Sequence, residues 1–89
     1  MEINLTIEVW KKGKWYIASC PELDFVSQGV TVEEAKNNLR EVVEIQFEEM
    51  RQMGTFEDYL TECGYVKEEN ATYSQPEMIG FEKQSLQVA

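Results

Sequence analysis

The sequence predicts an α+β fold in which a long helix covers one face of a three-stranded antiparallel sheet. Residues 3–9 alternate apolar and polar side chains with the period of two that is typical of a half-buried strand. A second run of β-formers, residues 15–20, follows a short polar connection that contains Gly13, which indicates a hairpin. Residues 32–53 carry apolar side chains at spacings of three and four, which predict an amphipathic helix.

The chain of 89 residues is predicted to form one domain, because so short a chain buries enough apolar surface for one core only. Its hydrophobic content of 43% is ordinary for a globular protein. We divide it into a β-meander over 1–29, a long helix over 32–53, a short helix over 55–64, a loop over 65–77 and a terminal strand over 78–89.

The connection from the sheet to the long helix has several predicted structural residues. Pro21 must end or bend the second strand, because proline brings no N–H to the ladder. A short third strand over 25–28 leads to Gly29, where a glycine relaxes the turn. Thr31 and Glu34 have the spacing of a capping box, in which the hydroxyl accepts from one free amide and the carboxylate accepts from another. The long helix should therefore begin directly after Thr31.

Glycines and a final alternation predict the remaining elements. Gly54 is expected to end the long helix, Thr55 to cap the short helix, and Gly64 to end it. Leu86 and Val88 alternate with polar residues near the C-terminus. This terminal strand returns after a helical crossover, so we expect it to pair in parallel with the first strand.

The net charge of −9 is concentrated in the middle of the chain. Residues 32–69 hold eleven of the 17 acidic residues but only four of the eight basic ones. Such a surface repels phosphate backbones and attracts basic proteins over a screening length of about 8 Å at physiological salt. Three lysines near Trp10 and Trp15 offer a nucleic-acid contact as one interpretation, but we favour a structural role for them, because cross-strand aromatic pairs stabilise sheets and lysine protects a sheet edge from aggregation. We expect no direct nucleic-acid binding.

Catalytic chemistry is not expected. The chain has no histidine, so the commonest general base and the commonest neutral metal ligand are both missing. Glu2 and Glu8 share a predicted strand face, but six residues separate them by about 20 Å, too far to share a metal. We therefore predict no catalytic residue, no metal and no cofactor.

The chain is expected to be a cytoplasmic protein without a membrane partner. Its first residues lack the apolar run of an export signal, and no stretch approaches membrane-spanning length. Cys20 and Cys63 are far apart in the sequence, and we expect both to be small buried hydrophobic residues in a reducing compartment.

One stripe of the long helix is acidic, and it lies opposite the apolar stripe. Its candidate partner-binding residues are Glu34, Glu41, Glu44 and Glu48. The stripe is either a solvated face that confers solubility or a docking strip for a basic protein. Glu44 and Glu48 are like charges at i,i+4, which costs roughly a few tenths of a kcal/mol and favours docking. Ile45 and Phe47 flank the apolar stripe and are candidates for an oligomer interface.

Two segments carry a resemblance to a known family: YIASCPEL at residues 16–23 and SQGVTVEEA at residues 27–35, followed by the acidic helix. They resemble the amino-terminal domain of HicB-like antitoxins over about residues 3–60. That domain is similar to a truncated ribonuclease-H-type sheet with one long helix. Its members bind and block a small basic HicA-type toxin that cleaves messenger RNA. Many also repress their operon through a carboxy-terminal DNA-binding domain, but no helix-turn-helix pattern follows Gly64, so DNA binding is not carried over.

The resemblance implies an antitoxin-like protein-binding module that neutralises a HicA-type toxin by covering it. The alternative is a free-standing oligomeric HicB-like regulatory or structural domain without a toxin partner. In either case we expect a homodimer or a higher homo-oligomer, because a flat sheet with an exposed terminal strand has edges to cover.

Overall fold

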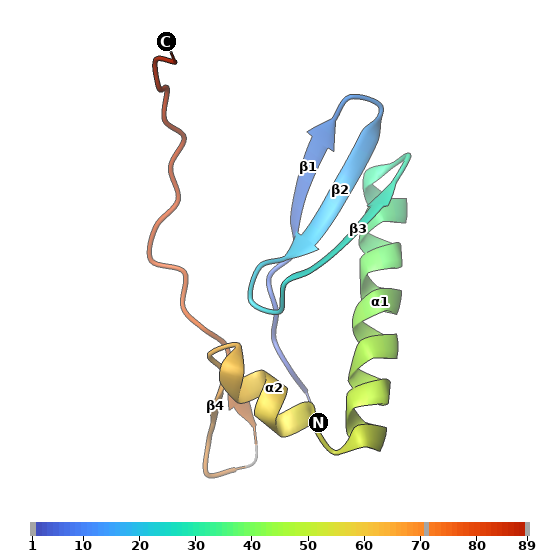
Figure 1. The fold of residues 1–89 in the computed structure, drawn as a ribbon, viewed down its shortest axis with the longest axis vertical. Helices are drawn as coiled ribbons and strands as arrows, with labels where there is room; N and C mark the ends of the chain where they lie inside the picture. Colours follow the sequence, from blue (N-terminus) through green and yellow to red (C-terminus); the bar gives the residue numbers. More distant parts are fainter. Residues whose placement is uncertain (1, 71, 89) are drawn as a thin grey trace.

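The computed structural model of the chain describes residues 2–70 and 72–88. Its elements in chain order are β1 (Glu8–Lys12), β2 (Trp15–Cys20), β3 (Phe25–Gly29), α1 (Val32–Met53), α2 (Phe56–Glu62), β4 (Val66–Lys67) and β5 (Tyr73–Ser74). The first three strands form an antiparallel meander in the order β1-β2-β3, and β4 pairs with β5 in a separate two-stranded sheet. Helix α1 packs along β3 and β2 (Figure 1). The predicted α+β class is confirmed.

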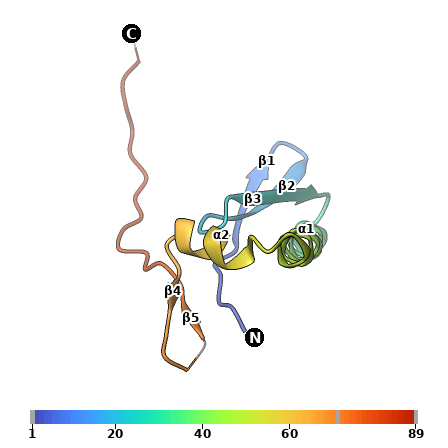
Figure 2. The same ribbon diagram turned by 60° about the horizontal axis from the view of Figure 1, so that its bottom comes forward.

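One core lies between the meander and the two helices. Strand alternation points Ala18 and Cys20 of β2 toward α1, and both are fully buried. Helix α1 contributes Ala35, Leu39 and Val43 at spacings of four, so one helical stripe faces the sheet. The remaining buried apolar residues come from the β2–β3 turn, α2, the position before β4, and β5: Leu23, Phe56, Leu60, Tyr65 and Tyr73. Figure 2, with α1 seen end-on, shows this helix on one side of the meander.

The start of α1 is locked onto the end of β3. Thr31 is the N-cap, as the capping-box spacing predicts: its Oγ1 accepts from Glu34 N at 3.0 Å, and Val30 N donates to Glu34 Oε1 at 3.3 Å. Gly29 has a different role from the one expected. Its φ is not positive, but an added Cβ would meet Ala35 N at 2.6 Å, so glycine is needed for close approach.

The predicted residues at the ends of the two helices are confirmed only in part. Gly54 closes α1 in the left-handed region, with φ 75°, as predicted. The predicted cap of the second helix is wrong, because Thr55 makes no side-chain capping bond and its hydroxyl lies 3.5 Å from Met50 O. Thr55 is the single residue between the helices, and its φ of −107° and ψ of 1° are not the extended values of an N-cap. Gly64, with φ 93°, follows α2.

The first strand begins later than predicted. Residues 3–7 form no strand: the β1–β2 ladder stops at the pair Glu8 and Ser19, β2 ends at Cys20, and Pro21 brings no N–H that could extend the ladder. The predicted apolar face is still used. Ile3, Leu5 and Ile7 are half-buried and pack against the core.

The C-terminal part differs most from expectation. The predicted loop over 65–77 contains β4 and β5, and residues 78–88 form no strand, so the parallel terminal strand is wrong. Both views show residues 76–88 as an extended segment that runs free of the rest of the molecule over most of its length (Figures 1 and 2). Alternation specifies an apolar face, but a strand also needs a neighbour for its backbone groups. Met1, Ala71 and Ala89, which belong to the predicted ranges, lie outside the described residues.

Candidate functional site

The acidic stripe is a single exposed face of α1. All four of its predicted members are exposed: Glu34, Glu41, Glu44 and Glu48. They lie on the side of the helix opposite Ala35, Leu39 and Val43, which are buried against the sheet. At 1.5 Å per residue the stripe is about 21 Å long. The packing of α1 on the meander therefore turns the stripe toward solvent.

Glu34 differs from the other three glutamates because its carboxylate is already used. Glu34 Oε1 accepts from Val30 N at 3.3 Å and closes the cap of α1. Glu41 and Glu44 have no such backbone contact among the described residues, and Glu48 accepts only a weak bond from Gln52 Nε2 at 3.4 Å. The carboxylates that remain open to a partner are those of Glu41, Glu44 and Glu48.

These three carboxylates are not neutralised within the described part of the chain. The salt bridges found there join Lys36 to Glu33 at 3.7 Å and Lys67 to Glu57 at 3.3 Å. Arg40, the nearest arginine along the helix, donates instead to Asn37 Oδ1 at 2.8 Å. The face therefore presents unpaired negative charge on a rigid helix.

Ile45 lies within the acidic face and not beside the apolar stripe. It stands four residues after Glu41 and three before Glu48, so both are its neighbours on the helix surface. Its side chain is 63% exposed. Together with Glu44, Glu48, Glu49 and Gln52 it lines a shallow surface hollow. An apolar centre with an acidic rim is thus built on one helix face.

Phe47, the other candidate for an oligomer interface, has a different position. Its ring is half-buried and packs edge-on against Phe56, with centroids 4.9 Å apart, and against Phe25 at 6.4 Å. Phe25 in turn stacks on Tyr59 at 6.0 Å. Phe47 therefore joins α1 to β3 and α2, whereas Ile45 points to solvent.

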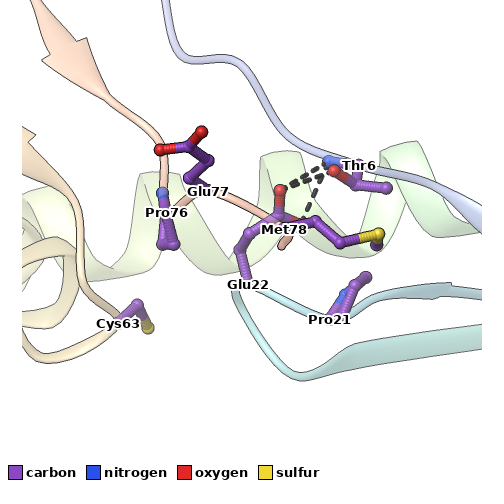
Figure 3. Close-up of a pocket in the computed structure, with 7 residues that line it drawn as sticks. All are labelled: Thr6, Pro21, Glu22, Cys63, Pro76, Glu77 and Met78. Carbon is purple, nitrogen blue, oxygen red and sulfur yellow. Dashed lines mark hydrogen bonds between the residues drawn. The ribbon is translucent and has the colours of Figure 1, made fainter. Parts of the chain in front are cut away.

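A second cluster of polar side chains lies at the exit of β2 (Figure 3). The Glu22 carboxylate accepts from Thr6 N at 3.1 Å, from Thr6 Oγ1 at 2.7 Å and from Gln75 Nε2 at 2.7 Å. These bonds tie the N-terminal segment and the segment after β5 to the β2–β3 turn. Sequence reasoning missed the cluster, because 16 residues separate Thr6 from Glu22 and 53 separate Glu22 from Gln75.

The ionisation of this cluster suits a structural role. Partial burial alone would raise the pKa of Glu22, but the hydrogen bonds from Thr6, its own backbone and Gln75 outweigh burial and lower it. Burial raises the pKa of the neighbouring Cys20 thiol to about 11, and its Sγ donates to Glu22 Oε1 at 3.6 Å. A carboxylate held ionised and surrounded by donors is a weak base, and a protonated thiol is a poor nucleophile.

A shallow pocket of about 300 Å³ adjoins Glu22, and Figure 3 draws the side chains around it. Its lining residues are Thr6, Pro21, Glu22, Cys63, Pro76, Glu77 and Met78. Pro21 directly follows the last residue of β2, as expected, and forms one wall. Across residues 2–70 and 72–88, no three cysteines or carboxylates gather closely enough to hold a metal ion.

Comparison of the chain with protein-family models, with curated proteins and with solved structures gave no significant match. Among the described residues, no helix combines the length and apolar character needed to cross a membrane.

Proposed function

We propose that this chain is a HicB-like antitoxin module that binds a small basic mRNA-cleaving toxin of the HicA type and covers it. The observation that carries the proposal is the outer face of α1, where Glu41, Glu44 and Glu48 surround the exposed Ile45 without compensating cations in the described chain. The resemblance over residues 16–35 supplies the class of partner. A cytoplasmic location belongs to this proposal, because the toxin acts on messenger RNA.

The physical chemistry of this face suits a basic protein. Unpaired carboxylates steer a positively charged partner during diffusional encounter, which raises the association rate. An apolar side chain surrounded by polar groups is the arrangement of an interface hot spot, in which the rim excludes water from the anchor. Glu41, Glu44 and Glu48 therefore act mainly on association, and Ile45 acts mainly on dissociation.

Charge reversal tests the electrostatic part. Changing Glu41, Glu44 and Glu48 together to lysine should lower the association rate with the HicA-type toxin encoded beside the gene by about an order of magnitude at low salt. The difference should shrink toward 1 M salt, where the Debye length is about 3 Å. Surface-plasmon kinetics measure both rates, and circular dichroism checks the fold.

A matched control separates this face from net charge. Glu62, Glu69 and Glu77 are exposed acids outside α1, and their reversal to lysine changes the total charge equally. This control should keep most of the wild-type association rate. Equal rates for wild type and the α1 variant would assign the stripe to solubility alone.

Truncation of Ile45 tests the apolar part. Ile45→Ala should weaken toxin binding by about tenfold or more, chiefly through faster dissociation. Met53→Ala removes an equally exposed apolar side chain from the end of the same helix and should leave binding unchanged. Unchanged dissociation in Ile45→Ala would remove Ile45 from the interface.

The second candidate, an oligomeric HicB-like domain without a toxin partner, is favoured by a separate observation. The face of the meander opposite α1 exposes Trp10, Trp15 and Val26. A folded wild-type chain that shows no binding to the adjacent toxin at micromolar concentration would favour this candidate over the first.

A further inference from the structure

The meander has one face that the described chain leaves open. Because side chains alternate along β2, those on the side opposite Ala18 and Cys20 point away from α1. The strand register places Trp10 opposite Ile17 and Ser19 opposite Val26 on that side. Trp10 is half exposed and Val26 is 60% exposed. Large apolar side chains that gather on an exposed sheet face mark an interaction surface.

The C-terminal tail, residues 76–88, is a second apolar surface without a cover. Ile79 is 94% exposed and Val88 is 88% exposed. The other large apolar residues of the tail are also exposed: Met78, Phe81 and Leu86. Ordered proteins rarely leave so many large apolar side chains in water within one short segment. Within residues 2–70 and 72–88, these apolar side chains of the tail are therefore left mostly uncovered.

The geometry of the tail directs it outward. Its base is held where Gln75 bonds Glu22 at 2.7 Å, and from there the segment runs along the β1 side of the meander (Figure 1). It meets its own sheet at the edge of the open face: Lys83 Nζ lies 5.9 Å from the centre of the Trp10 ring, and Phe81 lies beside Trp10. The tail thus borders the open face of its own chain and leaves its own apolar residues exposed.

Charge favours a second copy at this face over any other face of the molecule. The net charge of −9 makes two copies repel one another, most strongly at the acidic α1. The hairpin end of the meander is different, because Lys12 lies on the open face opposite Trp15, Lys14 follows in the turn, and both are exposed. The tail carries Glu77 and Glu82, so a tail from another copy meets lysines and an apolar surface together.

We propose that two copies of this chain exchange their tails, so that residues 76–88 of each copy cover the open meander face of the other. The arrangement is two-fold symmetric and uses each apolar surface once per copy, which closes the assembly at a dimer. In this arrangement the apolar side chains of the tail cover the sheet face, and no new strand pairing is required. This inference does not depend on the toxin-binding proposal, because it uses the opposite side of the sheet from α1.

Two variants of the full-length chain test the exchange, and each damages one of the two surfaces. Val26→Asp damages the face but leaves the tail intact, and the double variant Ile79→Asp, Phe81→Asp damages the tail but leaves the face intact. Wild type should have about twice the single-chain mass of 10.4 kDa at tens of micromolar by light scattering. Each variant should have the single-chain mass. Met53→Asp, an exposed apolar position on α1, should keep the dimer mass.

Mixing the two variants distinguishes exchange from folding of the tail onto its own sheet. The intact tail of the face variant fits the intact face of the tail variant, so an equimolar mixture should regain a dimer fraction and a blue shift of tryptophan fluorescence. Circular dichroism checks that each variant is folded. If the tail variant does not fold, a chain with residues 79–89 deleted takes its place. A monomeric wild type, a dimer that survives both variants, or monomeric variants that never combine would each overturn the proposal.

Discussion

Two segments of this chain share an apolar pattern but have opposite surroundings. Ile3, Leu5 and Ile7 alternate with polar residues ahead of β1, and Leu86 and Val88 alternate in the same way in the tail. Both segments lie outside the strands. The first three side chains are nevertheless half-buried against the core, whereas the last two are exposed. Alternation therefore marks an apolar face without deciding whether that face is covered.

Specific contacts hold the N-terminal segment in place. Thr6 donates to Glu22, and Tyr65 donates from its hydroxyl to the Asn4 carbonyl at 2.7 Å. Leu5 and Ile7 then lie beside Leu39 and Val43 of α1, together with which they line a small hollow. The tail instead borders its sheet at Trp10. A few tertiary hydrogen bonds thus hold the N-terminal segment where its apolar side chains are buried.

The largest expected effect comes from removing the anchor of the N-terminal segment. Glu22→Ala leaves the amide and hydroxyl of Thr6 without their acceptor and should release Ile3, Leu5 and Ile7 from the core. We expect a loss of about 3 kcal/mol in the free energy of unfolding, because hydrogen bonds to a charged group contribute about 1.5–3 kcal/mol each. Urea melts measure it, with exposed Glu77→Ala as the control. Overlapping melts for Glu22→Ala and wild type would show that the segment is held by its apolar contacts alone.

A matched pair of leucines compares the two segments directly. Leu5→Ala should lower the free energy of unfolding by about 2 kcal/mol, because the half-buried side chain leaves a void against α1. Leu86→Ala should change it by less than about 0.5 kcal/mol at submicromolar concentration, which favours the single chain. Denaturant unfolding at that concentration gives both values. Equal losses would mean that the tail of a single chain is packed as well as its N-terminus.

Two threonines sharpen the contrast between local and tertiary signals. Thr31→Ala removes the hydroxyl that accepts from Glu34 N and should cost about 1 kcal/mol of stability. Thr55→Ala removes a hydroxyl that caps nothing and should cost less than half of that. Thermal or urea melts of the two variants measure both losses of stability. A larger loss in Thr55→Ala would contradict the assignment of the caps.

The smallest effect is a pH dependence that belongs to Glu22. Its folded-state pKa lies below the ordinary value of 4.5, so the ionised carboxylate stabilises the fold. That contribution is complete above about pH 4.5 and is lost as the pH falls below this value through the lowered pKa. Wild type should therefore lose more stability than Glu22→Gln between pH 5 and pH 3 in urea melts. Parallel pH curves for the two proteins would contradict this linkage.

Features that need only neighbours along the chain were predictable from the sequence. The capping box joins residues three apart, Gly54 ends its helix through its own backbone freedom, and Gly13 makes its own turn with φ 62°. The acidic stripe is likewise a consequence of helical spacing. Thr55 does not cap α2 although threonine is a preferred N-cap residue, because a one-residue link between the helices holds its backbone away from the extended conformation that a cap requires.

The sequence by itself determined the class of fold, the length of α1 and the gathering of Glu41, Glu44 and Glu48 on one side of it. Only the tertiary structure decided that Ile45 is left exposed to solvent while Phe47 packs against Phe56. It also decided that the N-terminal segment is anchored by Glu22 and that the tail is not buried. The physical reason is that propensity and periodicity act over a few residues, whereas burial and hydrogen bonding depend on which distant groups the folded chain brings within reach.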